Sequence, residues 1–106
     1  MEIINYKGNV LNILGSVDRP YFIGAEVGRV LGYIQPTKAI WDQVWKHNKI
    51  LYSELFGTIP FQNGSHIKPH SILLSKHGLY QLIFASKLKT AQRFQQFIID
   101  ALPKLR

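Results

Sequence analysis

The side chains that most often carry out catalysis are few in this chain, and their spacing does not group them. Its 106 residues include six aspartates and glutamates, four histidines and no cysteine. No two carboxylates have the short spacing of an acid–base or metal-binding pair, and the sequence contains neither a P-loop nor a serine nucleophile elbow. We therefore predict a protein without a catalytic centre.

His66 and His70 come nearest to the pattern of a metal site. Lys68 and Pro69 lie between them, and no helix is predicted there to hold both imidazoles on one face. Zinc sites usually have three or more organised ligands, and the lack of cysteine excludes thiolate sites and disulfides. We expect neither a metal nor another cofactor, and the lack of cysteine favours an intracellular setting.

Positive charge is the strongest compositional signal. Thirteen lysines and arginines against six acidic residues give a formal net charge of +7. Residues 1–43 are neutral overall, so residues 44–106 carry the whole excess. This concentration favours a polyanionic partner such as DNA; the alternative is a basic surface without a nucleic-acid partner.

Basic residues cluster near two predicted helix ends, and two tryptophans accompany one of the clusters. Lysines beside a helix end are well placed to bind phosphate, and indole rings can stack on bases. We therefore predict DNA contacts from eight residues: Lys38, Trp41, Trp45, Lys46, Lys49, Lys87, Lys89 and Arg93. The tryptophans leave two alternatives open, namely burial beneath neighbouring strands and contact with a second copy or a regulator protein.

Hydrophobic periodicity and turn residues predict the elements that must position these side chains. Strands are expected at 2–6, 10–14 and 21–23, helices at 25–31 and 36–46, strands at 50–52, 56–61 and 72–74, a helix capped by Ser75, and a last helix over 91–105 loosened by Pro103. Asn63-Gly64 favours a hairpin turn. The result is an α+β fold in one domain, residues 1–106: a small antiparallel sheet packed with about four helices, with a helix–turn–helix-like unit at 25–46.

Two predicted helices have distinctive faces. In the helix at 36–46, Lys38 and the two tryptophans gather opposite the apolar pair Ile40 and Val44. The helix after Ser75 is apolar nearly all round and should be central to the core, with Leu79, Tyr80, Leu82, Ile83 and Phe84. No apolar run is long enough to span a membrane, and the N-terminus lacks the layout of a signal peptide.

Two sets of motifs resemble the Bro-N domain family. Residues 21–33, YFIGAEVGRVLGY, followed by PTKAI at 36–40, are similar to the family's aromatic strand, its "D-V-A-x-x-L-G-Y" helix and its "N-P-x-K-A-I" segment. Further along, Gly78-Leu79-Tyr80, Phe94-Gln95 and the ending ALPKLR at 101–106 follow its C-terminal pattern. The resemblance covers residues 10–106 in the right order.

This resemblance implies a DNA-binding domain of the baculovirus repeated-open-reading-frame type, which also occurs in phage antirepressor-like proteins. In such proteins the N-terminal domain binds DNA, often with little sequence preference, and a separate C-terminal domain usually follows. The chain departs from the family where basic residues are common, at Trp41, Ala85 and Gln96, and Phe97 replaces a tryptophan. These departures favour a protein partner as the alternative.

We therefore predict a non-catalytic viral DNA-binding domain, acting inside the infected host cell in the control of transcription or replication. Mainly phosphate contacts would give weak sequence preference and strong salt dependence, on double- or single-stranded DNA. The alternative is an antirepressor-like interaction or dimerisation module that uses the tryptophan face. No membrane partner is expected.

Overall fold

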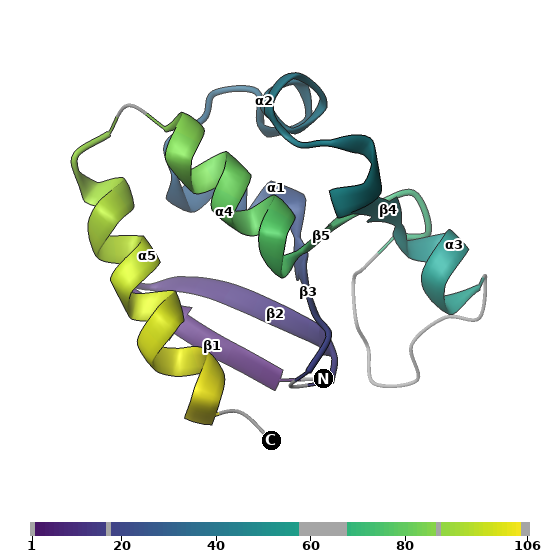
Figure 1. Ribbon diagram of the computed structural model, residues 1–106, viewed down its shortest axis with the longest axis horizontal. Coiled ribbons are helices and arrows are strands. Elements are labelled where there is room, and N and C mark those ends of the chain that lie inside the picture. The colour runs from purple at the N-terminus through teal and green to yellow at the C-terminus, as the bar shows by residue number, and fades with distance from the viewer. Residues whose placement is uncertain (1, 17, 58–67, 87, 105–106) are drawn as a thin grey trace.

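A five-stranded antiparallel sheet forms the centre of the computed structural model (Figure 1), which describes residues 2–16, 18–57, 68–86 and 88–104. The spatial order of the strands is β1-β2-β3-β5-β4. Their bounds are β1 Glu2–Tyr6, β2 Asn9–Gly15, β3 Pro20–Ile23, β4 Lys49–Leu51 and β5 Ile72–Ser75. Strands β4 and β5 are neighbours, although a long stretch of chain separates them in sequence. In this order β4 lies at one edge of the sheet and β1 at the other.

Local chemistry explains the first hairpin. Lys7 and Gly8 both have positive φ, 50° and 85°, as a tight turn between antiparallel strands requires. The Asn5 side chain accepts a hydrogen bond from the Gly8 N–H at 2.9 Å, which satisfies a donor of the turn. The predicted strands at 2–6, 10–14 and 21–23 are confirmed as β1, β2 and β3.

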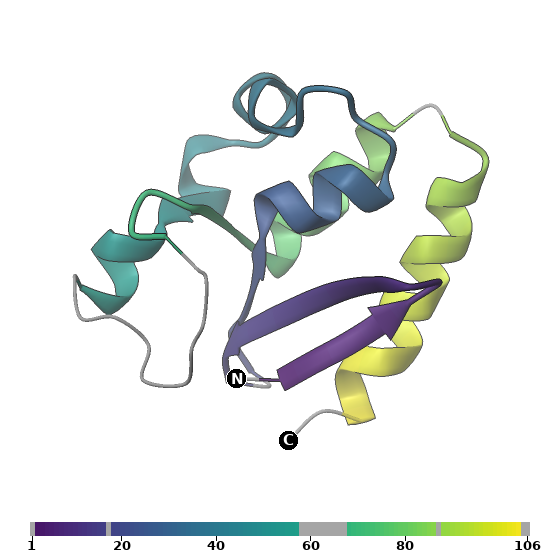
Figure 2. The same cartoon turned by 180° about the vertical axis from the view of Figure 1, so that it is seen from behind.

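Helices cover the two faces of the sheet unequally (Figures 1 and 2). The main core lies on one face beneath α1 Gly24–Val30, α2 Pro36–Gln43, α4 Lys76–Ala85 and α5 Thr90–Ala101. A smaller core on the other face lies beneath α3 Tyr52–Phe56. Because side chains alternate along a strand, Leu74 of β5 enters the main core and Leu73 enters the smaller one. The expected α+β class is thus confirmed.

Helices α4 and α5 begin as the sequence predicts, but α5 ends at Ala101, before the predicted residue 105. Ser75 caps α4, its hydroxyl accepting a hydrogen bond from the Gly78 N–H at 3.2 Å. Helix α5 buries a stripe of Ala91, Phe94 and Ile98 and gives way at Leu102 to the short 3-10 helix η2 Leu102–Lys104, which contains Pro103. Proline lacks the N–H that would continue the α-helical bonding.

The second predicted helix ends earlier than expected. Helix α2 stops at Gln43, and Val44 is extended with φ −104° and ψ 128°. Val44 is β-branched and inserts its side chain into the main core, so the backbone leaves the helical path there. The next residues form the 3-10 helix η1 Lys46–Asn48 and then β4. The helix–turn–helix-like unit, predicted with a helix to residue 46, stays a prediction.

Tyr52 and Phe56 were predicted in strands and lie instead in α3. Their four-residue spacing on a helix lets both rings pack in the smaller core, with centroids 5.0 Å apart. Gly57, with φ 75°, ends this helix. The rest of the predicted strand, at 58–61, and the Asn63-Gly64 turn lie outside the described residues.

Candidate nucleic-acid interface

The start of α5 carries two unpaired cationic side chains. Lys89, the residue before the helix, and Arg93, one turn later, are both exposed. Neither has a hydrogen bond or an acidic partner within the described part of the chain. The first turn of α5 contains no acidic residue. The positive end of the α5 dipole and these two cations together favour a bound anion.

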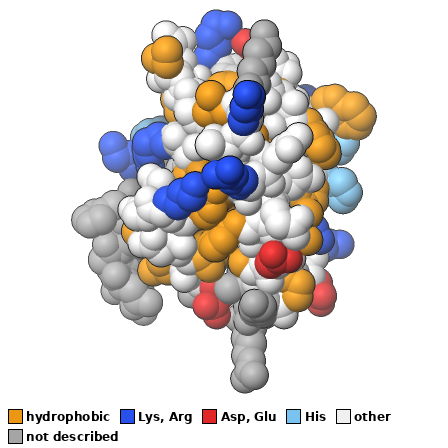
Figure 3. Space-filling view, turned by 90° about the vertical axis from the view of Figure 1, so that its left-hand side faces the viewer, with side chains coloured by type: hydrophobic (Ala, Val, Ile, Leu, Met, Phe, Trp, Pro, Cys, Tyr) orange, Lys and Arg blue, Asp and Glu red, His pale blue; other side chains and the backbone are white. Residues whose placement is uncertain are grey.

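Exposed hydrophobic side chains lie beside Lys89. Phe84 at the end of α4 is 73% exposed and Leu88 is 47% exposed. With Lys89, Gln92 and other residues they line a shallow hollow of about 480 Å³ between the two helices. Figure 3 shows Lys and Arg side chains on this side of the molecule, with hydrophobic atoms between them. Lys87, predicted to belong to this cluster, lies outside the described residues.

The exposure of Phe84 corrects one expectation. Helix α4 buries Gly78, Leu79, Leu82 and Ile83, so it is central to the core as predicted, but Phe84 is not part of that core. The ring of Phe84 points out from the face of the helix opposite the core. An apolar residue next to a cluster of lysines in the sequence was the signal that could have identified it as a surface residue.

The cations near α2 are engaged by the protein itself. The Lys38 Nζ forms an exposed ion pair with the Asp42 Oδ2 at 2.9 Å, one helical turn away. The Lys49 Nζ donates a hydrogen bond to the Val44 carbonyl oxygen at 2.8 Å and lies 4.4 Å from the centroid of the Trp41 ring. Lys49 therefore stabilises the chain where α2 ends, and its ammonium group supports the indole.

Both tryptophans are exposed, Trp41 at 61% and Trp45 at 64%. Burial beneath neighbouring strands is therefore wrong for both. They do not share one helical face, because Trp45 follows the end of α2 in an extended conformation. The backbone N–H of Trp45 donates to the Gln81 Oε1 at 3.1 Å, and its ring lies 5.4 Å from that of His47. Lys46, the next residue, is exposed.

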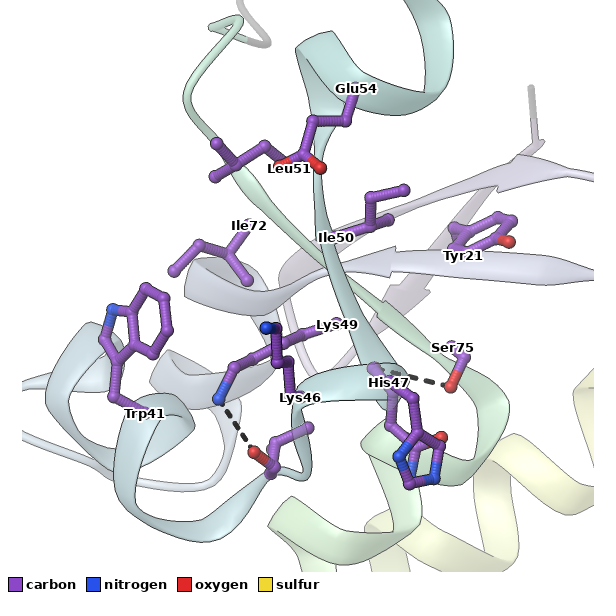
Figure 4. Close-up of a pocket in the computed structure, with 12 residues that line it drawn as sticks. Tyr21, Trp41, Lys46, His47, Lys49, Ile50, Leu51, Glu54, Ile72 and Ser75 are labelled. Carbon is purple, nitrogen blue, oxygen red and sulfur yellow. Dashed lines mark hydrogen bonds between the residues drawn. The ribbon is translucent and has the colours of Figure 1, made fainter.

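A larger hollow of about 750 Å³ lies between α2, η1, β4 and α3 (Figure 4). Trp41 and Leu51 lie on one side of it and Ile50 and Tyr21 on another, with Lys46 and Glu54 among the charged residues of its wall. Glu54 was not among the predicted site residues. It can be recognised only from the fold, because α3 was not predicted.

The described residues offer no other obvious chemistry. Among residues 2–16, 18–57, 68–86 and 88–104, no group of three or more His, Cys, Asp or Glu side chains is placed to hold a metal ion. His66, one of the two spaced histidines, lies outside these ranges. No helix of this part of the chain has the length and apolar character that crossing a membrane requires.

Comparisons with known proteins agree on one relationship. Residues 11–103 match the sequence model of the BRO family, N-terminal domain (Bro-N). The chain is similar to the Bro-N domain-containing protein 289L of Invertebrate iridescent virus 6, with 32% identity over 91% of this chain and 26% of that protein. It is also similar to protein 201R of the same virus, with 29% identity over 97% of this chain and 28% of that protein. The chain thus spans little more than a quarter of either relative, and no solved structure matches it.

Proposed function

Because this chain belongs to the Bro-N family, as the match over residues 11–103 shows, we propose that residues 1–106 form a DNA-binding domain of a viral regulatory protein. It would act without catalysis, inside the infected cell, in the control of transcription or replication. The observation that carries the proposal is the pair of exposed, unpaired cations at the start of α5, Lys89 and Arg93.

Phosphate is the part of DNA that this surface fits. The two cations lie one turn apart beside the N–H groups of the first turn of α5, and no carboxylate of that turn opposes them. Such contacts fix a protein on the duplex without reading its bases. We therefore propose binding with weak sequence preference and strong salt dependence.

The other predicted contacts rank below these two. Lys46 in η1 and Trp45 just before it are both exposed. Lys46 forms no ion pair within the described residues, so it can bind a phosphate without losing an acidic partner. Lys38 and Lys49 are held by Asp42 and by the Val44 carbonyl, so a phosphate would have to compete with those partners. Lys87 keeps its proposed role from its position in the sequence alone.

Fluorescence anisotropy with a labelled random duplex and its single strand, across a salt series, tests the proposal. Replacing Lys89 and Arg93 together by glutamate should weaken binding by about ten- to a hundred-fold and reduce the salt slope by about two. The matched control replaces Arg19 and Lys68, also exposed, by glutamate and changes the net charge equally. Equal losses in both double variants, or no binding at low salt, would remove the α5 surface as the DNA site.

A second candidate function is docking of a protein through the tryptophans. Their exposure of 61% and 64% favours it, since large aromatic side chains left in water are enriched at the centres of protein interfaces. Replacing each tryptophan by alanine and measuring self-association by sedimentation separates dimerisation from binding of another protein. If neither variant changes self-association, dimerisation through the tryptophans is excluded.

A further inference from the structure

The strand β4 is an edge of the sheet with one side unpaired. It bonds to β5 through the pairs Lys49–Leu74, Ile50–Leu73 and Leu51–Ile72, and no other described strand lies beside it. An edge strand presents backbone N–H and C=O groups that can bond to a further strand. At the opposite edge, β1 pairs with β2 in the same way.

The hollow of about 750 Å³ follows this edge on both faces of the sheet (Figure 4). Ile50 points to the face of the smaller core, together with Tyr21. Its neighbours Lys49 and Leu51 point to the opposite face, toward Trp41, because side chains alternate along a strand. A hollow lined by both sets of residues must pass along the edge of β4, where an added strand would lie.

Charge is distributed unevenly along the hollow. Lys46 and His47 precede β4 and lie at one end, and Glu54 in α3 lies at the other. Between them the wall is mainly aliphatic and aromatic, and Lys49 adds a second ammonium group there, so two lysines face one glutamate. The cationic end favours a carboxylate on the ligand, and the middle favours a bulky apolar side chain.

We propose that the edge of β4 binds an extended, acidic segment of a partner protein as a sixth strand. Its backbone would bond to β4, a carboxylate would lie beside Lys46, and an apolar side chain would pack on Trp41 and Leu51. This interaction goes beyond DNA binding by α5 and uses other residues. A polypeptide strand fits this edge better than a nucleic acid does, because its backbone carries both the N–H donors and the C=O acceptors that pair with an edge strand.

The test uses octapeptides in which glutamate alternates with valine, isoleucine or phenylalanine, and a matched set in which lysine replaces glutamate. Binding is followed through the amide NMR signals of Lys49, Ile50 and Leu51. Glutamate peptides should shift these signals and slow hydrogen exchange of the β4 amides that point away from β5. The peptides with lysine in place of glutamate should do neither. N-methylation of the central peptide residues, which removes backbone donors and keeps the side chains, should weaken binding by about ten-fold.

Two tryptophan variants provide a matched pair. Trp41→Ala should weaken peptide binding by about ten-fold, because the indole lines the hollow. Trp45→Ala removes the same side chain at nearly the same exposure but outside the hollow, and should leave peptide binding unchanged. Equal losses in the two variants would contradict the assignment of the hollow as the docking site.

Other outcomes would overturn the proposal directly. If no glutamate peptide shifts the β4 amides, or if the lysine set binds equally well, the edge does not accept an acidic strand. If an oligothymidine strand shifts these amides and displaces the peptide, the hollow binds nucleic acid. DNA binding measured on the same samples keeps the two proposals separate, because the Lys89→Glu, Arg93→Glu variant should retain peptide binding.

Discussion

The start of α5 and the hollow beside β4 lie toward opposite ends of the molecule and handle positive charge differently (Figure 1). At α5 the two cations project from a regular helix and are unpaired in the described structure. Beside β4, Lys49 donates to the Val44 carbonyl just after α2 ends. A helix satisfies its own interior carbonyls, whereas the chain beyond its end needs donors from elsewhere. The comparison shows that the backbone beyond the end of α2 engages Lys49, whereas Lys89 and Arg93 at the start of α5 remain available to a ligand.

The largest expected effect on stability comes from replacing Gly78 by alanine. The structural disturbance should be confined to the region of the hollow. A methyl group at Gly78 would collide with the Asn48 carbonyl oxygen and lie 3.2 Å from the Val44 Cγ1. Gly78→Ala must push η1 outward, and we expect it to lower the free energy of unfolding by about 2–3 kcal/mol in urea titrations. Peptide binding at β4 should be lost while DNA binding by α5 is kept.

Gly8→Ala is the control for Gly78→Ala. Gly8 has φ +85° and no atom within 4 Å of the place that a Cβ would take, so only backbone strain opposes the substitution, at about 1 kcal/mol. If the two variants unfold at the same urea concentration, or if Gly78→Ala disturbs α5 as much as η1, the two regions are not independent.

The second prediction sets Lys49 against Lys89. Lys49→Met removes the hydrogen bond to Val44 and the contact over Trp41, and should lower the free energy of unfolding by about 1–2 kcal/mol. Lys89→Met changes an exposed, unpaired side chain and should stay within about 0.5 kcal/mol of wild type. Urea unfolding measures both. DNA anisotropy should show the reverse ranking, with Lys89→Met the weaker binder; the same ranking in both assays would refute the distinction.

The third prediction concerns the packing under α5. The Tyr6 ring lies 5.2 Å from that of Phe94 and 4.8 Å from that of Phe97. Its hydroxyl is buried and has no hydrogen-bond partner in the described part of the chain. Tyr6→Phe removes that cost and should raise the free energy of unfolding by about 0.5–1 kcal/mol, with unchanged DNA affinity. A thermal midpoint below that of wild type would show that the hydroxyl is satisfied.

Sequence reasoning succeeded where one segment determines its own structure. The first hairpin, the Ser75 cap and the buried stripe of α5 follow from turn residues, a capping hydroxyl and a regular period, and the structure contains all of them. The unpaired cations of α5 were foreseeable for the same reason, because they lie on the solvent face of a strongly amphipathic helix.

The elements that could not be predicted are those whose structure depends on residues far away in the sequence. The end of α2 depends on Val44 entering the core and on Gln81 accepting from the Trp45 N–H, 36 positions away. Helix α3 forms because the N–H of Tyr52 donates to the Ser71 carbonyl and its ring packs on the smaller core. The hollow beside β4 is built from these two segments, so neither its shape nor Glu54 in its wall could be predicted locally.

The smallest expected effect is on the pH dependence of the free energy of unfolding, and it is absent at neutral pH. It tests whether β4 and α3 unfold locally before α5 does at alkaline pH. Burial raises the pKa of Tyr52, Tyr33 and Tyr80 above the ordinary tyrosine value. In the unfolded chain these phenols lose their protons above about pH 10, while in the folded chain they keep them longer. Folded protein then binds more protons than unfolded protein, so stability is intact below that pH and falls as pH rises through the raised pKa.

Tyr52→Phe, in the core beneath α3, should flatten the fall seen in urea titrations from pH 8 to 11, and amide exchange should rise in β4 and α3 before it rises in α5. A fall of equal steepness in Tyr52→Phe and wild type would show that the hollow side is no more sensitive to alkali than the α5 end.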